Sequence, residues 1–351
     1  MTIEAFITHK QAENFSDCQD RFSVSNDTKS IAVSDGMGST WQQKIWAQIL
    51  VDKFTENADW LPNHDDIKPL CKIWREKVVD FIQHLKDTNA PENIIIRNER
   101  NLAEGRSAGA TFVGIRFDGN NWNGSVLGDS CLIEWNGTEA KFHTSQDVEA
   151  FDSYPDYFDS NASKEGRGIP KEINGELIKG NYLFLVSDPF SDFLLEQNKK
   201  GNITEYIQQL LSLGTHEEFE ELVEQWRNIG MHNDDTTLVI IESDDSASFS
   251  LQHIDDIHVF IEEEKAKKNK EATIPVIEPK QEGVEEDQKE EPSFITPSFV
   301  PAPIFIEEFL NEYHAILEKR RFLSNLKYKH TKKAARTALE TLFKKYSIIL
   351  K

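Results

Sequence analysis

The chain has 351 residues and a formal net charge of -22 at pH 7, which is long enough for one large domain and a smaller part. Because nucleic acids and anionic membranes require a basic protein face, this charge argues against both as the main partner. The cysteines are few, odd in number and without metal-ligand spacing, which indicates reduced thiols rather than a disulfide framework: Cys18, Cys71 and Cys131. With no signal-peptide pattern and no apolar run of membrane-spanning length, the sequence predicts a cytoplasmic protein.

The first clear strand signal, IAVSDGMGST (31–40), ends on a carboxylate. Its alternating apolar residues predict a strand that stops at Asp35, and two glycines follow at once. Gly36 has no side chain, so its carbonyl is able to approach a cation directly, and Gly38 lets the chain leave the strand for a helix. A carboxylate that holds a cation requires this kind of uncrowded exit from the strand.

Helices and strands alternate only loosely along the chain. Helical spacing of apolar residues predicts helices over 40–55, 68–86, 203–213 and 216–229. Ser39 or Thr40 is the predicted N-cap of the first helix. Strand signals predict strands over 110–117, 122–129, 130–135, 181–188, 236–243 and, at a sheet edge, 248–254. Because strands cluster and helices come in pairs, an α+β fold with helix-covered antiparallel sheets is expected.

The composition changes near Glu262. Residues 1–255 have a globular composition, whereas residues 256–303 are rich in Glu, Lys and Pro, which predicts a linker. Residues 304–351 are predicted as two amphipathic helical segments and carry 11 Lys and Arg against 5 Asp and Glu. A basic helical tail on an acidic body favours docking, either on residues 1–255 or on a partner. A solvated helical pair with one packed face is the alternative.

Aspartates stand at the ends of several buried strands: Asp20, Asp35, Asp129, Asp188 with Asp192, Asp234 and Asp235. One such aspartate alone is usually a turn former. Several at neighbouring strand ends would lie close together, and their mutual repulsion favours hard divalent cations such as Mg²⁺ or Mn²⁺. No His-x-x-x-His or Cys-x-x-Cys pair points to zinc.

Six motifs in this order resemble those of the metal-dependent type-2C protein phosphatases, the PPM family: CQDRF (18–22), VSDGMGS (33–39), SAGATFVG (107–114), VLGDSCLIEWNG (126–137), LVSDPFSD (185–192) and NDDTTLVII (233–241). The opening ITHKQAENFSDCQD is similar to a bacterial branch of that family. The resemblance covers residues 1 to about 255. It implies an α-β-β-α sandwich, in which two antiparallel sheets are flanked by helix pairs.

The resemblance also implies a site and a reaction. Two Mn²⁺ or Mg²⁺ ions, with a weaker third, would be held by Asp35, Gly36, Asp188 and Asp234 and, for the third, by Asp129 and Asp192. Asp35 would bridge the first two ions, with Asp20 close by. The implied reaction is hydrolysis of phosphoserine or phosphothreonine in proteins by a water held between the two metals.

Three positions beside these motifs depart from the family pattern. Gln19 stands where many relatives have Glu, although Gln recurs in bacterial members. Met37 replaces a His of animal members, so water would protonate the leaving group. Pro189 replaces the usual Gly after a metal aspartate, and proline removes a backbone donor next to a ligand.

The arginine that binds phosphate upstream of the Gln-Asp motif is missing, because Phe15 falls at that place. His9 is the expected substitute as a catalytic phosphate contact, with Arg106 and Arg167 as further candidates. A structural role for His9 is the alternative. The polar segment 142–178 sits where the family places a variable flap, and it is expected either to face the substrate or to be an irregular surface insertion.

Two other interpretations compete with an active phosphatase. Pro189, the missing arginine and the basic tail are also typical of a phosphatase-like module that binds or regulates a partner without catalysis. An adventitious cation-binding surface on a sheet scaffold would leave the ordered motifs unexplained. The expected partners are a phosphoprotein substrate and, through residues 304–351, a kinase or another signalling protein.

Overall fold

A computed structural model describes residues 1–146, 155–164, 166–243 and 248–272 of the chain. The chain divides into two units, Met1–Val276 and Ile277–Lys351. The predicted tail, 304–351, and the predicted linker beyond residue 272 lie outside the described residues, as does part of the predicted flap. Within the described ranges, no helix is long and apolar enough to cross a membrane.

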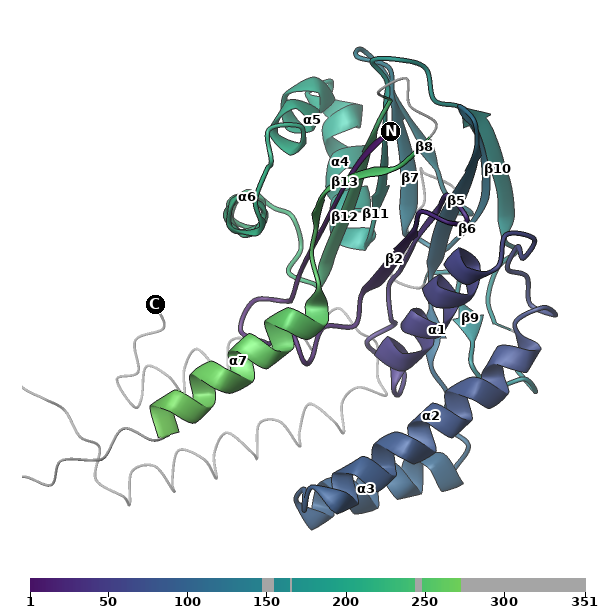
Figure 1. Cartoon of the computed structure of the whole chain (residues 1–351), viewed down its shortest axis with the longest axis vertical. Coiled ribbons are helices and arrows are strands. Elements are labelled where there is room, and N and C mark those ends of the chain that lie inside the picture. Colours follow the sequence, from purple (N-terminus) through teal and green to yellow (C-terminus); the bar gives the residue numbers. More distant parts are fainter. Residues whose placement is uncertain (147–154, 165, 244–247, 273–351) are drawn as a thin grey trace, which may run out of the picture. The chain divides into compact units, whose positions relative to one another are not determined.

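Two sheets form the centre of the first unit (Figure 1). The first has the order β13 (Ser250–Ile254), β1 (Thr2–Thr8), β12 (Thr236–Glu242), β11 (Tyr182–Val186), β7 (Cys131–Trp135), β8 (Ala140–His143). The second has the order β10 (Lys171–Glu176), β6 (Asn121–Leu127), β5 (Phe112–Asp118), β3 (Ser30–Ser34), β2 (Arg21–Ser25). A short ladder joins β4 (Gly109–Ala110) to β9 (Phe158–Asp159). All pairings are antiparallel except that of β1 with the predicted edge strand β13, which is parallel.

Both faces of each sheet are covered, which explains the continuous apolar runs in the sequence. In β12, Val239 and Ile241 belong to the cluster between the two sheets, whereas Leu238 and Ile240 belong to a cluster under the helices. Successive side chains of a strand point to opposite faces, so one strand serves both clusters. The expected sandwich of two sheets between helix layers is confirmed.

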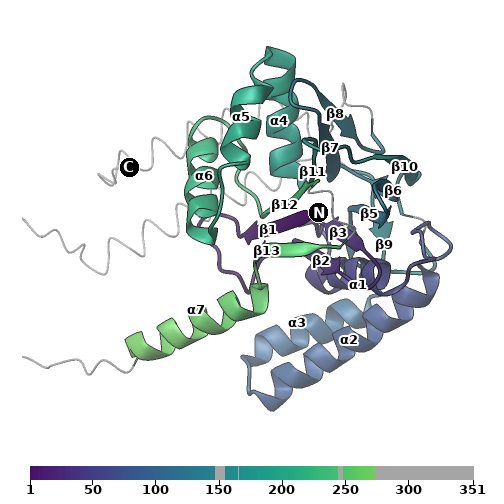
Figure 2. The ribbon, with the colours of Figure 1, turned by 45° about the horizontal axis from the view of Figure 1, so that its top comes forward.

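Helices cover both outer faces of the sandwich (Figure 2). On the first sheet they are α4 (Asp188–Lys200), α5 (Ile203–Leu210) and α6 (His216–Asn228). On the second they are α1 (Gln43–Glu56), α2 (Lys68–Asp87) and α3 (Glu92–Ala103). α3 was not predicted, because its three isoleucines (94–96) are consecutive rather than at helical spacing, and Asn98 is its one buried residue.

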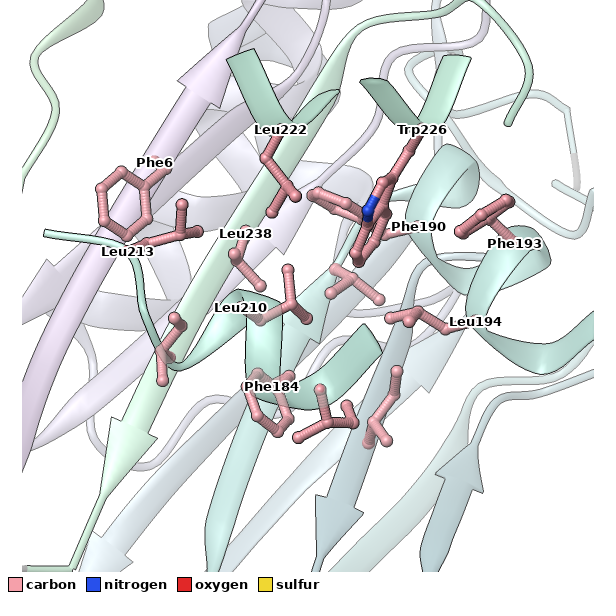
Figure 3. Close-up of a cluster of buried hydrophobic side chains, with 14 of the residues drawn as sticks. Phe6, Phe184, Phe190, Phe193, Leu194, Leu210, Leu213, Leu222, Trp226 and Leu238 are labelled. Carbon is pink, nitrogen blue, oxygen red and sulfur yellow. The ribbon is translucent and has the colours of Figure 1, made fainter. Parts of the chain in front are cut away.

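The helices over the first sheet pack through large aromatic side chains (Figure 3). Trp226 of α6 lies edge-on to Phe190 at 5.3 Å and stacked on Phe193 at 5.1 Å, measured between ring centroids. Its indole N–H donates to Gln209 Oε1 at 2.9 Å, so the buried ring leaves no donor unsatisfied. This packing fixes α4, the helix that opens on Asp188, against the sheet.

Two predictions about the chain outside the sheets are wrong. The predicted linker begins with a helix, α7 (Ile257–Ala272), because Ile257 and Phe260 pack with Phe15 against the domain. The prediction used the overall composition of a segment rich in Glu and Lys, in which these few apolar residues had little weight. The predicted flap, 142–178, likewise contains β9 and the whole of β10, which pairs with β6.

The start of α1 also differs from the prediction. The helix begins at Gln43 after Gln42, whose φ of 56° is left-handed, and no side chain caps it. The Thr40 hydroxyl instead donates to Met37 O at 2.8 Å and accepts from Gly109 N at 3.0 Å. Thr40 therefore pins the loop after β3 to the β4–β9 ladder rather than capping a helix.

Candidate metal centre

A cavity of about 460 Å³ opens where the strands of both sheets end on aspartates. Its lining residues are Gln19, Asp35, Gly36, Met37, Gly38, Ser39, Asp129, Pro155, Asp188, Asp192, His232 and Asp234. All five lining aspartates were predicted from the sequence as metal ligands, and so was Gly36. The cavity lining contains no Lys or Arg side chain among the residues that the structure describes.

Asp35 is held by the backbone at the end of β3. Its N–H donates to Thr111 Oγ1 at 3.2 Å, and its carbonyl accepts from Thr111 N at 2.9 Å. Gly36 continues as an isolated bridge to Ala110. A Cβ on Gly36 would lie 3.0 Å from Gln19 O and 2.9 Å from Gln43 Cγ, so a side chain has no room there. The glycine is thus required by the close approach of two chain segments.

Asp188 and Asp234 come together because β11 and β12 are antiparallel neighbours. Ser187 N donates to Thr237 O at 3.2 Å, and Thr237 N donates to Ser187 Oγ at 2.9 Å. Asp188 follows the first of these residues, and Asp234 lies three positions before the second. The strand pairing therefore sets the position of both aspartates.

Asp129 and Asp192 form the other end of the cavity. Asp192 lies one turn after Asp188 on α4, as the four-residue spacing predicts. Ser191 Oγ, on the same helix, donates to Asp129 O at 2.6 Å and fixes the end of β6 against α4.

Asp20 lies behind the cavity rather than in its lining. Its side chain is completely buried, and its Oδ2 accepts from Thr237 Oγ1 at 2.8 Å. Its charge is also among the causes that raise the pKa of Asp35. Burial, and next the charge of Asp235, raise the pKa of Asp20 to about 7.

The crowding of these carboxyl groups opposes their ionisation. Burial, followed by the charge of Asp188, raises the pKa values of Asp35 and Asp129 well above the ordinary range. The same two causes raise the pKa of Asp192 to about 6. Burial also raises the pKa of Asp188, although a hydrogen bond from His232 lowers it in part. A group of anions with this much mutual repulsion favours a bound cation.

The oxygen atoms fit a divalent metal. Asp20 Oδ1, Asp129 Oδ1 and Asp192 Oδ1 are buried and have no hydrogen-bond partner among the described residues. Ionised carboxylates accept but do not donate, and Mg²⁺ and Mn²⁺ prefer oxygen ligands. No three His, Cys, Asp or Glu side chains within the described ranges surround one common position for an ion. An ion held here would therefore complete its shell with water and the Gly36 carbonyl, as Mg²⁺ commonly does.

Two cationic groups at the site were not predicted. Lys10 Nζ lies 2.7 Å from Asp234 Oδ1, and His232 Nε2 lies 2.9 Å from Asp188 Oδ2. The hydrogen bond to Asp188 raises the pKa of His232. Lys10 and His232 lie on loops, where no periodicity marks them. The only available signal was their sequence proximity to His9 and to the Asn-Asp-Asp motif.

Asp235 has a structural role beside the candidate metal ligands. Its Oδ1 accepts from Lys10 N at 2.8 Å, and its Oδ2 accepts from Gln19 N at 2.7 Å. Both oxygens of Asp235 are therefore used to hold the loop between β1 and β2 in place. Through this loop Gln19 reaches the cavity, as expected from the motif that contains it.

His9 is not brought into the cavity. Its ring lies edge-on to Phe15 at 4.7 Å, and its Nε2 is 3.9 Å from Glu264 of α7. Phe15 is almost fully buried, and its ring lies tilted to that of Phe260 with the centroids 4.7 Å apart, so an arginine at this place would have to bury its charge under α7. The structural alternative for His9 is the one that the geometry favours.

The two arginines named from the sequence also lie elsewhere. Arg106 lines a different cavity, and Arg167 Nε lies 3.6 Å from Asp156 Oδ1.

Pro189 fits its position without disturbing the ligand before it. It stands in the first turn of α4, directly after Asp188. The backbone N–H groups of a first helical turn have no partner within the helix, and the fixed φ of proline suits that turn. The lost donor is therefore one that the helix does not use.

The sequence model of a family described as Protein phosphatase 2C matches residues 9–227. This range contains Asp20, Asp35, Asp129, Asp188 and Asp192, whereas Asp234 follows it. No curated protein sequence matches the chain.

Solved bacterial phosphatases are similar at low identity. The S. agalactiae serine/threonine phosphatase is 15% identical over 69% of this chain and 99% of that chain, with a TM-score of 0.42. Stp1 from Staphylococcus aureus is 16% identical over 69% and 95%, with a TM-score of 0.42. The catalytic domain of the phosphatase PstP in complex with two manganese ions is 17% identical over 68% and 96%, with a TM-score of 0.39. The family assignment rests on the sequence match rather than on these likenesses.

Proposed function

Because the chain belongs to the protein phosphatase 2C family, we propose that it hydrolyses phosphoserine and phosphothreonine in proteins with bound Mn²⁺ or Mg²⁺. The observation that carries this proposal is the single cavity into which four separate strand ends bring five aspartates. Orphaned oxygens of Asp129 and Asp192 in that cavity support a role in holding cations rather than in building turns.

The proposed ligands form three groups. Asp35 and the Gly36 carbonyl would hold the cations from the β3 end, and Asp188 and Asp234 from the β11–β12 end. Asp129 and Asp192 would hold a third, weaker ion. Such cations, when bound, lower the pKa of water to make a nucleophile at neutral pH and neutralise charge on the phosphoryl oxygens.

The remaining residues of the site position these ligands. Asp20 accepts a hydrogen bond from Thr237 of β12, and its charge acts on Asp35 at the end of β3. Lys10 and His232 hold one oxygen each of Asp234 and Asp188. Met37 carries no exchangeable proton, so solvent water protonates the leaving serine or threonine oxygen.

The test is hydrolysis of p-nitrophenyl phosphate and of a phosphothreonine peptide, with Mn²⁺, with Mg²⁺ and with chelator. Asp35→Asn and Asp188→Asn are run beside Asp118→Asn, an exposed aspartate at the end of β5. We expect turnover that requires a divalent metal, is lost in the first two variants and persists in the third. Well-folded wild-type protein that is inactive with every metal would instead favour a binding module.

A role for the tail is a separate proposal. Residues 304–351 are proposed to recruit a kinase or another signalling protein. Truncation after residue 272 removes the tail and leaves the contacts of Phe260 and Glu264 with the domain, whereas a cut at residue 262 would remove Glu264. Unchanged partner binding and unchanged turnover after truncation at 272 would rule out this role.

A further inference from the structure

We propose that a second, basic cavity is a subsite for a negatively charged side chain of the substrate, about four residues from the phosphorylated one. The proposal rests on the phosphatase function proposed above and adds a substrate preference to it.

The second cavity differs in charge from the first. It has a volume of about 300 Å³, and its floor includes the buried side chain of Trp74. Four basic side chains line it, Lys68, Lys72, Arg75 and Arg106, and no Asp or Glu of the described part of the chain does. In a chain of net charge -22 such a lining is unexpected, because most of its surface repels anions.

Three of these cations, those of Lys72, Arg75 and Arg106, are available to a ligand, whereas Lys68 Nζ lies 2.6 Å from Asp65 Oδ1. Lys72 Nζ is 3.8 Å from Glu76, and Arg106 Nε is 3.6 Å from Glu104, in pairs whose side chains are all exposed. Exposed pairs of this kind contribute little free energy, so a ligand displaces them at small cost. Arg75 has no ion pair with any residue that the structure describes. A carboxylate or phosphoryl group in the cavity would form charge-assisted hydrogen bonds with them.

The wall of the basic cavity is already ordered. Ser107 Oγ donates to Asp159 Oδ2 at 3.2 Å, and Asn161 N donates to Asp159 Oδ1 at 2.8 Å. Ala108 N donates to Ser160 Oγ at 2.8 Å. Both oxygens of Asp159 are thus turned into the wall rather than into the cavity. A site whose wall is fixed in advance loses little entropy on binding.

The β4–β9 ladder lies between the two cavities. At one end Met37, which lines the acidic cavity, donates through its N–H to Gly109 O at 3.0 Å. At the other end Gly105 and Arg106 line the basic cavity. Four residues separate Gly105 from Gly109, so the two ends lie at most about 14 Å apart. An extended substrate segment covers this distance with about four residues, which sets the expected spacing.

The segment that contains β9, the other strand of the ladder, also runs from the acidic cavity to the basic cavity. Pro155 lines the acidic cavity, and Ser160 lines the basic one, five residues later. Trp41 N donates to Ser107 O at 3.1 Å, and its ring lies edge-on to that of Trp74 at 5.9 Å. The loop that follows Asp35 therefore reaches from the candidate metal centre to the floor of the basic cavity.

The experiment uses three phosphothreonine peptides that differ at one position, four residues from the phosphothreonine: Ala, Asp or phosphoserine. The same substitution is made on either side of the phosphothreonine, since the structure does not fix the direction of the chain. Peptide binding is measured by fluorescence anisotropy of labelled peptides, and kcat/KM is measured for each. The test protein is a double variant that combines Arg75→Gln with Arg106→Gln. The matched control is Arg97→Gln, which replaces an exposed arginine on α3.

We expect the Asp and phosphoserine peptides to bind about tenfold more tightly than the Ala peptide. Their KM should be lower than that of the Ala peptide, whereas kcat should be the same. The gain should disappear in the double variant, persist in Arg97→Gln, and shrink at high salt. Hydrolysis of p-nitrophenyl phosphate, which is too small to reach the second cavity, should be unchanged in all variants. Equal affinity for the three peptides in wild-type protein that still hydrolyses p-nitrophenyl phosphate overturns the subsite and leaves the phosphatase proposal intact. Absence of p-nitrophenyl phosphate turnover, with a charge preference in binding that the double variant abolishes, supports the subsite and overturns the phosphatase proposal.

Discussion

Asp20 and Asp255 are both almost completely buried, yet their oxygens are satisfied in different ways. Asp255 Oδ2 accepts from Ile7 N and from His216 Nδ1, each at 2.8 Å, and its Oδ1 accepts from His253 Nε2 at 2.8 Å. Asp20 Oδ2 accepts from Thr237, but its Oδ1 has no partner among the described residues.

The difference separates a structural carboxylate from one in a binding site. Burying a charge is costly unless hydrogen bonds or opposite charges replace the lost water. Asp255 has these partners from three elements and joins β1, α6 and the segment before α7. Asp20, Asp129 and Asp192 each have one buried oxygen without such a partner among the described residues, which favours stabilisation by a bound cation.

The largest effect is expected for activity in the acidic cavity. Asp35→Asn should lower kcat/KM by at least about 10³-fold, or about 4 kcal/mol, because it removes a charge that would hold both cations. Steady-state kinetics with saturating Mn²⁺ measures the loss, and circular dichroism verifies the fold. Activity within tenfold of wild type would contradict the assignment of Asp35.

The next largest effect is expected for stability at Asp255. Asp255→Asn should lower the free energy of unfolding by about 2–4 kcal/mol, since the two imidazoles would lose the charge they donate to. Urea denaturation at pH 6.5 measures the change. Asp118→Asn serves as the control, and a loss of less than 0.5 kcal/mol, roughly the size of a surface substitution, would show that Asp255 is not a structural carboxylate.

The same cluster predicts a pH dependence of stability. Burial lowers the pKa of His216, but hydrogen bonds to Asp255 and Glu220 outweigh it and raise the pKa to about 9. Because the folded pKa exceeds the unfolded value of about 6.5, the stabilisation is complete below pH 6.5 and is lost as the pH rises through 9. The loss should be about 3 kcal/mol at most.

Urea denaturation between pH 6 and pH 10 measures how the free energy of unfolding falls with pH, and His216→Gln should reduce this pH dependence. A slope that survives in the variant would mean that another group titrates.

The smallest expected effect is a gain in stability, from a substitution at Asp129. Burial and the charge of Asp188 raise the pKa of Asp129, so this carboxyl group destabilises the metal-free protein as the pH rises above its unfolded value of about 3.9. Asp129→Asn should therefore stabilise the protein by about 1 kcal/mol in chelator at pH 7. Adding Mn²⁺ should raise Tm more in wild type than in the variant. Destabilisation in chelator would place Asp129 with Asp255 rather than with the metal ligands.

Much of the fold, and the gathering of five aspartates in one cavity, was predictable because both depend on local pattern. Strand ends are visible as apolar runs that stop, and antiparallel pairing of β11 with β12 places Asp188 beside Asp234. Lys10 and His232 were not predictable, because their contacts join loops that no periodicity aligns. His9 was misplaced for a related reason: its neighbours Phe15 and Glu264 come from segments 249 residues apart.

The position of β1 has a consequence for how the protein is made. β1 lies between β12 and β13, and Thr2 pairs with both Glu242 and Ser250. β1 therefore leaves the ribosome well before both of its partner strands, and this large sequence separation slows folding. Until residue 242 has emerged, β1 has no partner strand, and its apolar side chains are exposed to aggregation. Chaperone binding to nascent chains should thus concentrate on β1 and decrease once β12 has emerged.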